Sequence, residues 1–195
     1  MFGLAVGNGG LEIWSRDDRD ELAISGSYYQ GLPSFEFISQ HVRFPKGAGL
    51  PGACWKEDRP RIIAQPQTAP DFIRSFDRDP AHLGDCVGLP IGREYGFPAA
   101  ILLLLSDENL PLALKLDVWH KQSESSSSDE IVFSGTRPET ANATWCQAIC
   151  DQLIESPNAL LLDQSSALLP NNYQSGLFLP FYDGKDLTDV FVVLF

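Results

Sequence analysis

The sequence predicts an α+β fold of two related modules, each an antiparallel sheet of about five strands with helices packed on its faces. Short apolar, β-branched and aromatic runs alternate with turns rich in Gly, Pro and Asp, which is typical of antiparallel strands. The same order of elements (hairpin, helical middle, short strand, second hairpin) occurs twice in the 195 residues. One supersecondary unit used twice explains both observations, and the helices then bury one side of each sheet.

The first half opens with a hairpin, because strand-like runs at 11–14 (LEIW) and 22–29 (LAISGSYY) flank a charged turn at 16–20. A short helix is predicted at 34–41, with Ser34 as its N-cap and with Phe37 and Ile38 facing the core. The remaining first-half elements are a short strand at 42–44, a glycine-rich turn at 47–52, a strand at 61–64, one or two helical turns at 71–76, and a hairpin of strands 86–91 and 97–105.

The second half repeats this order with a plainer middle. Strands are predicted at 112–119 and 131–135, on either side of a serine-rich acidic loop at 121–130. From Glu139 to Glu155 the apolar residues recur with a helical period, and Pro157 ends that helix. Three further strands are expected at 160–162, 176–182 and 187–195.

Short motifs support the internal repeat. LEIW at 11–14 matches LDVW at 116–119, and the run from Gly88 to Ile91 matches the run from Gly176 to Phe181. Each match is weak alone, but the matches occur in the same order in both halves. We therefore expect two domains, residues 1–106 and 107–195, the second being a degenerate copy of the first.

Charge and hydropathy exclude several classes of partner. The chain has 26 acidic and 14 basic residues, a net charge of −12, so it should repel nucleic-acid phosphates and anionic lipid. No run reaches the roughly 18 apolar residues of a membrane helix, and the N-terminus does not resemble a signal peptide. We expect a cytoplasmic protein that binds neither nucleic acid nor membrane and keeps its four cysteines reduced.

A set of motifs in the first half resembles the GAF domain family. The motifs are Phe44-Pro-Lys-Gly-Ala-Gly-Leu-Pro-Gly52, Trp55, Arg59-Pro-Arg-Ile-Ile63, Phe72-Ile-Arg74, Gly88-Leu-Pro-Ile91 and the final AILLLLS. The resemblance covers about residues 8–106, and residues 107–195 resemble a copy without the glycine turn. It implies a ligand pocket between a sheet and a layer of helices and loops, and a function in sensing small molecules, in dimerisation or in signalling. The family's cyclic-nucleotide signature and chromophore cysteine are not visible, so the sequence names no cofactor.

Six residues of the first half are candidates for lining a ligand pocket, since apolar walls with a few polar groups are typical of such sites. They are Tyr28, Phe35, Cys54, Trp55, Phe72 and Cys86. The alternative is that they pack a plain core. The glycines at 47–52 match a dinucleotide-binding motif, but the surrounding elements do not fit that site. They are better interpreted as a tight turn that seats Trp55.

Three functions remain as hypotheses. The first is a regulatory module that binds a small molecule in the first half. The second is an interaction scaffold, either a homo-oligomer or a protein bound to a partner, with the last strand (LTDVFVVLF) as an exposed edge that pairs. The third is a thiol reductase using Cys54 and Cys86, resembling free methionine sulfoxide reductases. We predict no catalytic residues and no metal site; Cys146 and Cys150, four apart on one helix, are expected to be buried.

Overall fold

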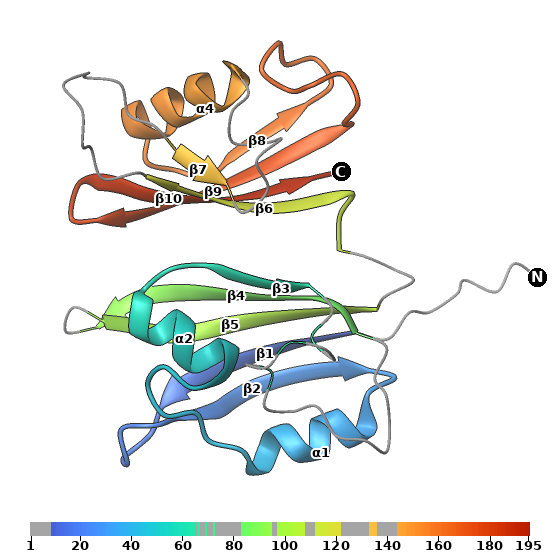
Figure 1. Ribbon diagram of the computed structural model, residues 1–195, viewed down its shortest axis with the longest axis vertical. Helices are drawn as coiled ribbons and strands as arrows, with labels where there is room; N and C mark the ends of the chain where they lie inside the picture. The colour runs from blue at the N-terminus through green and yellow to red at the C-terminus, as the bar shows by residue number, and fades with distance from the viewer. Residues whose placement is uncertain are drawn as a thin grey trace, which may run out of the picture. The chain divides into compact units, whose positions relative to one another are not determined.

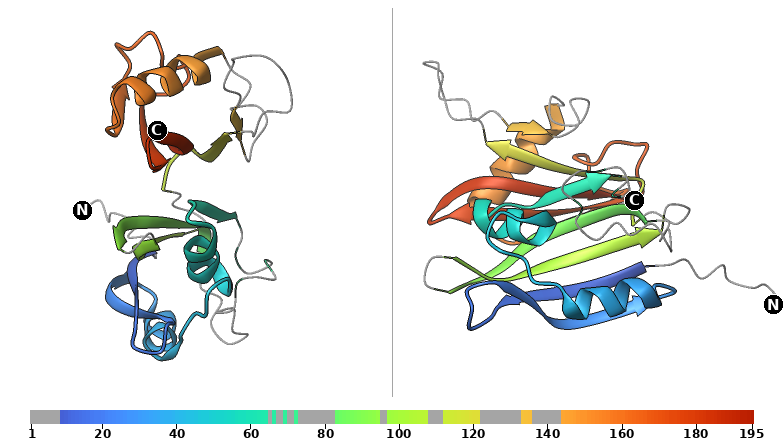
Figure 2. Two further views of the ribbon diagram at one scale, coloured as in Figure 1. Left: turned by 90° about the vertical axis from the view of Figure 1, so that its left-hand side faces the viewer. Right: turned by 60° about the horizontal axis from the view of Figure 1, so that its bottom comes forward.

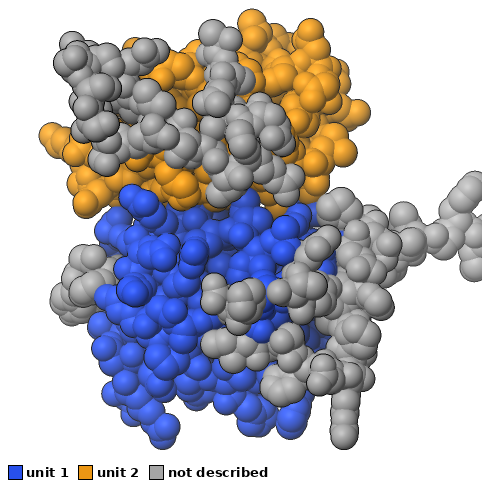
Figure 3. Space-filling view, in the orientation of Figure 1, with its two compact units in different colours: residues 1–112 blue, residues 113–195 orange. Residues whose placement is uncertain are grey.

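A computed structural model describes residues 9–64, 66, 69, 72, 83–94, 97–107, 112–121, 133–135 and 144–195. The chain divides into two compact units, Met1–Leu112 and Ala113–Phe195 (Figure 3). The division falls a few residues beyond the domain boundary that the sequence indicated. No helix that the structure describes combines the length and the apolar character needed to cross a membrane.

Unit 1 is a five-stranded antiparallel sheet, called sheet A, with two described helices. The elements in chain order are β1 (Gly9–Arg16), β2 (Leu22–Gln30), α1 (Pro33–His41), α2 (Gly49–Glu57), β3 (Arg61–Ala64), β4 (Leu83–Glu94) and β5 (Phe97–Asp107). The strand order is β2-β1-β5-β4-β3. Both helices contribute side chains to one core cluster and so cover the same face of the sheet (Figures 1 and 2). We call this the inward face.

Unit 2 repeats the topology. Its elements are β6 (Lys115–Lys121), β7 (Phe133–Gly135), α4 (Thr144–Glu155), β8 (Leu160–Asp163), β9 (Ser175–Asp183) and β10 (Asp186–Leu194). The order of this second sheet, sheet B, is β7-β6-β10-β9-β8. Counted within each unit, both sheets run second, first, fifth, fourth, third. The predicted α+β class and the repeated order of elements are therefore confirmed.

The strand registers show which residues of the two units are equivalent. Directly paired residues point to the same face of a sheet. In unit 1, one inward row runs from Trp14 through Ile101 to Pro90, and in unit 2 the matching row runs from Trp119 through Val190 to Pro180. The two prolines are therefore equivalent.

The glycines that the sequence matched are not equivalent. The next inward row of unit 1 runs from Glu12 through Leu103 to Gly88. The corresponding row of unit 2 runs from Asp117 through Val192 to Phe178. Phe178, and not Gly176, therefore occupies the place of Gly88. Gly176 lies four positions before Pro180, whereas Gly88 lies two positions before Pro90. Matching the two glycines in the sequence therefore gives the wrong equivalence.

Three predicted details of the elements are wrong. Helix α1 begins with Pro33 after the N-cap residue Leu32, not at Ser34. Phe37 is 66% exposed, whereas Phe35 and Ser39, one helical turn apart, are buried. The last strand is also not an edge, because β10 lies between β6 and β9. The predicted helical turns at 71–76, except Phe72, and the predicted loop at 121–130, except Lys121, lie outside the described residues.

The glycine-rich segment forms the entry to α2. Gly47 and Gly49 have φ of +89° and +58°, a backbone region that favours glycine. A Cβ on Gly52 would lie 2.3 Å from the carbonyl oxygen of Pro45, so no larger residue fits there. These contacts bring the helix to the sheet with Trp55 only 4% exposed, as predicted. The predicted turn at 47–52 is nevertheless shorter than expected, because residues 49–52 form the first turn of α2.

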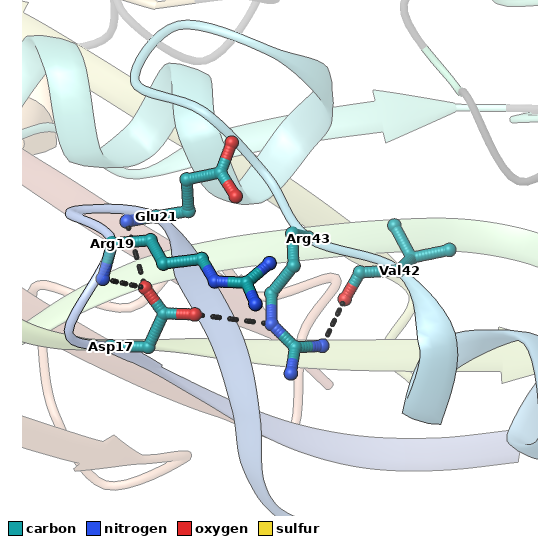
Figure 4. Close-up of polar contacts among 5 residues, drawn as sticks. All are labelled: Asp17, Arg19, Glu21, Val42 and Arg43. Carbon is teal, nitrogen blue, oxygen red and sulfur yellow. Dashed lines mark hydrogen bonds and ion pairs between the residues drawn. The ribbon is translucent and has the colours of Figure 1, made fainter.

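The β1–β2 turn is fastened to the segment between the helices by Asp17 (Figure 4). Its Oδ1 accepts hydrogen bonds from the backbone N–H groups of Arg19 (2.9 Å) and Glu21 (3.1 Å). Its Oδ2 accepts one from Arg43 Nε at 3.1 Å. Desolvation alone would raise the pKa of Asp17, but the two backbone donors and the Arg43 guanidinium outweigh it and lower the pKa.

This lowered pKa gives a prediction about stability against pH. Asp17 contributes stability above its unfolded pKa of about 3.9, and the contribution is lost as pH falls through the lower folded pKa. Asp17→Asn should therefore lower the urea midpoint at pH 7, and the difference from wild type should shrink as the pH falls below the unfolded pKa of about 3.9. The matched control is Asp18→Asn, on the exposed neighbouring residue, which should change little at any pH. A difference between wild type and Asp17→Asn that is constant with pH would contradict this assignment.

Candidate functional site

The inward face of sheet A meets α1 and α2 in one core cluster. Five of the six residues that the sequence proposed for a ligand site belong to it: Phe35, Cys54, Trp55, Phe72 and Cys86, each at most 6% exposed. Phe35 and Phe72 are nearly parallel, with ring centroids 6.2 Å apart and 12° between planes. The Nζ of Lys46 lies 5.6 Å from the centroid of the Trp55 ring, within cation–π range. The structure therefore brings these five residues together.

The prediction that Tyr28, the sixth candidate, lines the site is wrong. It is 66% exposed and lies outside the core cluster. The cause is a β-bulge, at which Ile13 pairs with Gly26 but Trp14 pairs with Ile24. Ser25 is the extra residue, and an extra residue reverses which later side chains face inward. Tyr29, and not Tyr28, consequently faces the core.

A buried carboxyl group lies in this core and was not among the predicted residues. Glu12 is 0% exposed. Its Oε2 accepts a hydrogen bond from Trp14 Nε1 at 2.8 Å, and its Oε1 accepts one from the Tyr29 hydroxyl at 2.6 Å. The Ser39 hydroxyl lies 3.0 Å from the same Oε1. The donors come from β1, β2 and α1, so this network joins three elements around one acidic side chain.

A signal for Glu12 was present in the repeated motif. In LEIW, strand alternation places Glu12 on the same face as Trp14 and opposite to Leu11 and Ile13. If Leu11 and Ile13 faced the core, Glu12 would face the solvent. A tryptophan at the matching position of both repeats indicates instead that Trp14 faces inward, and Glu12 must then follow it.

Helix α2 approaches the sheet most closely at Gly88. A Cβ added there would lie 2.5 Å from Cys54 Sγ and 3.2 Å from a carbon of Leu50. Burial raises the pKa of the Cys54 thiol to about 12. Thiol catalysis needs a thiolate near neutral pH, so Cys54 in this setting is a poor nucleophile. The packing at Gly88 assigns this cysteine a role in seating α2.

The equivalent face of unit 2 is closed by aromatic side chains. Trp119, Trp145 and Phe178 contact one another, with centroid separations of 5.3, 5.9 and 6.2 Å. Asp117 takes the place of Glu12, but its Oδ1 accepts the backbone N–H of Val118. Within the described part of unit 2, the buried Nε1 of Trp119 has no hydrogen-bond partner. Trp119 therefore does not donate to Asp117 in the way that Trp14 donates to Glu12.

The cysteines of unit 2 lie in its core. Cys146 and Cys150 are buried on α4, and all four cysteines of the chain are free, as the sequence predicted. A hydrogen bond with Cys146, together with burial, raises the pKa of Cys150. Among the described residues, no group of three or more His, Cys, Asp and Glu side chains is arranged to hold a metal ion.

Comparisons with known proteins give distant likenesses among solved structures alone. No family model and no curated protein matches the chain. One similar solved structure is described as a structural characterisation of the NreA protein of Staphylococcus aureus mutated in its nitrate binding site. It shares 15% identity with a TM-score of 0.39, over 54% of this chain and 77% of that one. A likeness at this level carries no argument about function.

The close approach at Gly88 can be tested by a double-mutant cycle. Gly88→Ala should destabilise the protein by about 1–3 kcal/mol, because the new methyl group overlaps Cys54 Sγ. Adding Cys54→Ala removes that atom and should recover about 1 kcal/mol of coupling energy in urea unfolding. Cys86→Ala is the matched control, since Cys86 is not among the three nearest atoms at this position. Equal coupling energies for the two cysteines would refute the proposed contact.

Proposed function

We propose that unit 1 is a small-molecule-binding regulatory module of the GAF type, with its ligand held between the inward face of sheet A and helices α1 and α2. The observation that carries the proposal is the Glu12 network. A carboxyl group is costly to bury, yet Glu12 is placed among aromatic side chains and supplied with hydrogen-bond donors. A few placed polar groups in an apolar, aromatic setting are what ligand sites provide.

The contrast between the repeats supports this proposal. Both units share a topology, and each buries an acid at the equivalent position of its inward face, Glu12 in unit 1 and Asp117 in unit 2. Unit 2 has Phe178 in the place of Gly88 and the shorter Asp117 in the place of Glu12. Unit 1 keeps the glycine and the longer acid. We infer that unit 1 has the binding role and that unit 2 serves as its structural companion.

One argument for the scaffold alternative is removed, because the last strand lies inside sheet B. Dimerisation and a protein partner stay predictions from the sequence. The reductase alternative is disfavoured by the raised pKa of Cys54.

The test is native mass spectrometry of the full chain purified from cells, followed by a screen of small molecules by thermal shift. A bound mass that leaves on denaturation, or a ligand that raises the melting temperature, supports the module. Phe35→Leu should weaken binding about tenfold or more, because it removes an aromatic wall. Phe37→Leu, two residues away on the exposed side of α1, should bind like wild type. A bare chain that no screened molecule stabilises would overturn the proposal.

A further inference from the structure

The core of unit 2 holds two cysteines one helical turn apart. Cys146 and Cys150 lie four positions apart on α4, and the two residues are 3% and 0% exposed. Side chains at this spacing meet on one face of a helix, and a hydrogen bond joins the two thiols. Both residues belong to the core cluster of unit 2. Two sulfur atoms are thus held side by side and away from water.

The spacing of this pair does not suit a disulfide. Residues four apart on a helix have Cβ atoms about 5–6 Å apart, whereas the Cβ atoms of a disulfide lie about 3.5–4.5 Å apart. Both thiols are free. A metal ion between two sulfur atoms fits a wider gap, because two opposite bonds of about 2.3 Å, the length of a zinc–sulfur bond, span roughly 4.5 Å. The pair therefore suits a bridging ion better than a direct sulfur–sulfur bond.

The surroundings of the pair favour a soft ion that needs few ligands. Among the described residues, no group of three or more His, Cys, Asp and Glu side chains could hold a metal ion, so the four ligands of a structural Zn²⁺ site are not assembled there. The pair instead shares its cluster with apolar side chains such as Ile149, Leu153 and Phe178. Thiolates select Cu(I) among the biological metals, and Cu(I) is stable with two sulfur ligands.

The charges near the pair work in both directions. The hydrogen bond with Cys146, burial and the carboxylate of Asp151 all raise the pKa of Cys150, so the empty pair stays protonated. A bound cation reverses this, because a coordinating thiol is deprotonated outright. Cys146 also lies in the first turn of α4, where the helix dipole stabilises negative charge. The Oδ1 of Asp151, an exposed residue, accepts a hydrogen bond from Gln147 Nε2 at 2.8 Å.

We propose that Cys146 and Cys150 form a two-coordinate binding site for Cu(I). Each sulfur exchanges its proton for a bond to the ion, both protons are released to solvent, and no oxidation state changes. The bound pair with its ion then carries a single negative charge. This site belongs to unit 2 and is independent of the ligand site proposed for unit 1.

The test is an anaerobic titration of the reduced full chain with Cu(I) in competition with the chelator bicinchoninate. Wild type should take one copper ion per chain from the chelator, and Cys146→Ala/Cys150→Ala should lose this binding. The matched control is Cys54→Ala/Cys86→Ala, which also removes two buried cysteines and should bind like wild type. Copper binding retained by Cys146→Ala/Cys150→Ala, or a wild type that leaves all copper with the chelator, would overturn the proposal.

The wild-type chain alone also decides, even if a variant does not fold. Trp145 precedes Cys146 and contacts Trp119 at a centroid separation of 5.3 Å. In ¹H–¹⁵N spectra, Cu(I) should therefore move the indole N–H signals of these two tryptophans and leave those of Trp14 and Trp55, in the core of unit 1, in place. X-ray absorption at the copper edge should show two sulfur ligands. Nitrogen or oxygen ligands, or movement confined to Trp14 and Trp55, would refute the assignment.

Discussion

The buried carboxyl group of Glu12 needs hydrogen-bond donors, and several elements of unit 1 supply them together. Buried without partners, such a group would cost about 1–3 kcal/mol, and more when ionised. Strand β1 therefore presents Trp14 on the same face as Glu12, the bulge in β2 turns Tyr29 inward, and α1 brings Ser39 to the same oxygen. The glycine-rich entry to α2 then closes the core beside this network, with Cys54 packed against Gly88.

The second unit shows how the same sheet is stabilised without that network. Its strand order and the inward tryptophan are retained. The inward acid of unit 2, Asp117, is one methylene shorter than Glu12 and accepts a hydrogen bond from the backbone N–H of Val118. Phe178 occupies the position that corresponds to Gly88, against which α2 packs in unit 1. The two units thus share their strand order, whereas their inward faces differ at the positions of Glu12 and Gly88. This separation is why a repeat can keep a fold and lose a site.

Much of the fold could be predicted from periodicity and turns, because those are local properties of the chain. The hairpins, α4 and the repeated order were accessible in this way. The position of Tyr28 was not, since a single bulged residue at Ser25 reverses the alternation and leaves no mark in composition. Glu12 was missed because an acid between two aliphatic residues normally faces water, and only the shared face with Trp14 reveals otherwise. The interior place of β10 depends on long-range pairing, which a strand's own residues do not encode.

We propose that unit 1 binds a small molecule at its inward face and that unit 2 does not. The four tryptophans divide evenly, Trp14 and Trp55 in unit 1 and Trp119 and Trp145 in unit 2, so their indole N–H signals report on each unit separately. The direct measurement is a ¹H–¹⁵N spectrum of the full chain during titration with a small molecule that raises its melting temperature. The account predicts that the Trp14 signal moves most, since its N–H bonds to Glu12, and that the unit 2 signals stay in place. Movement confined to Trp119 and Trp145, or no movement at all, would contradict it.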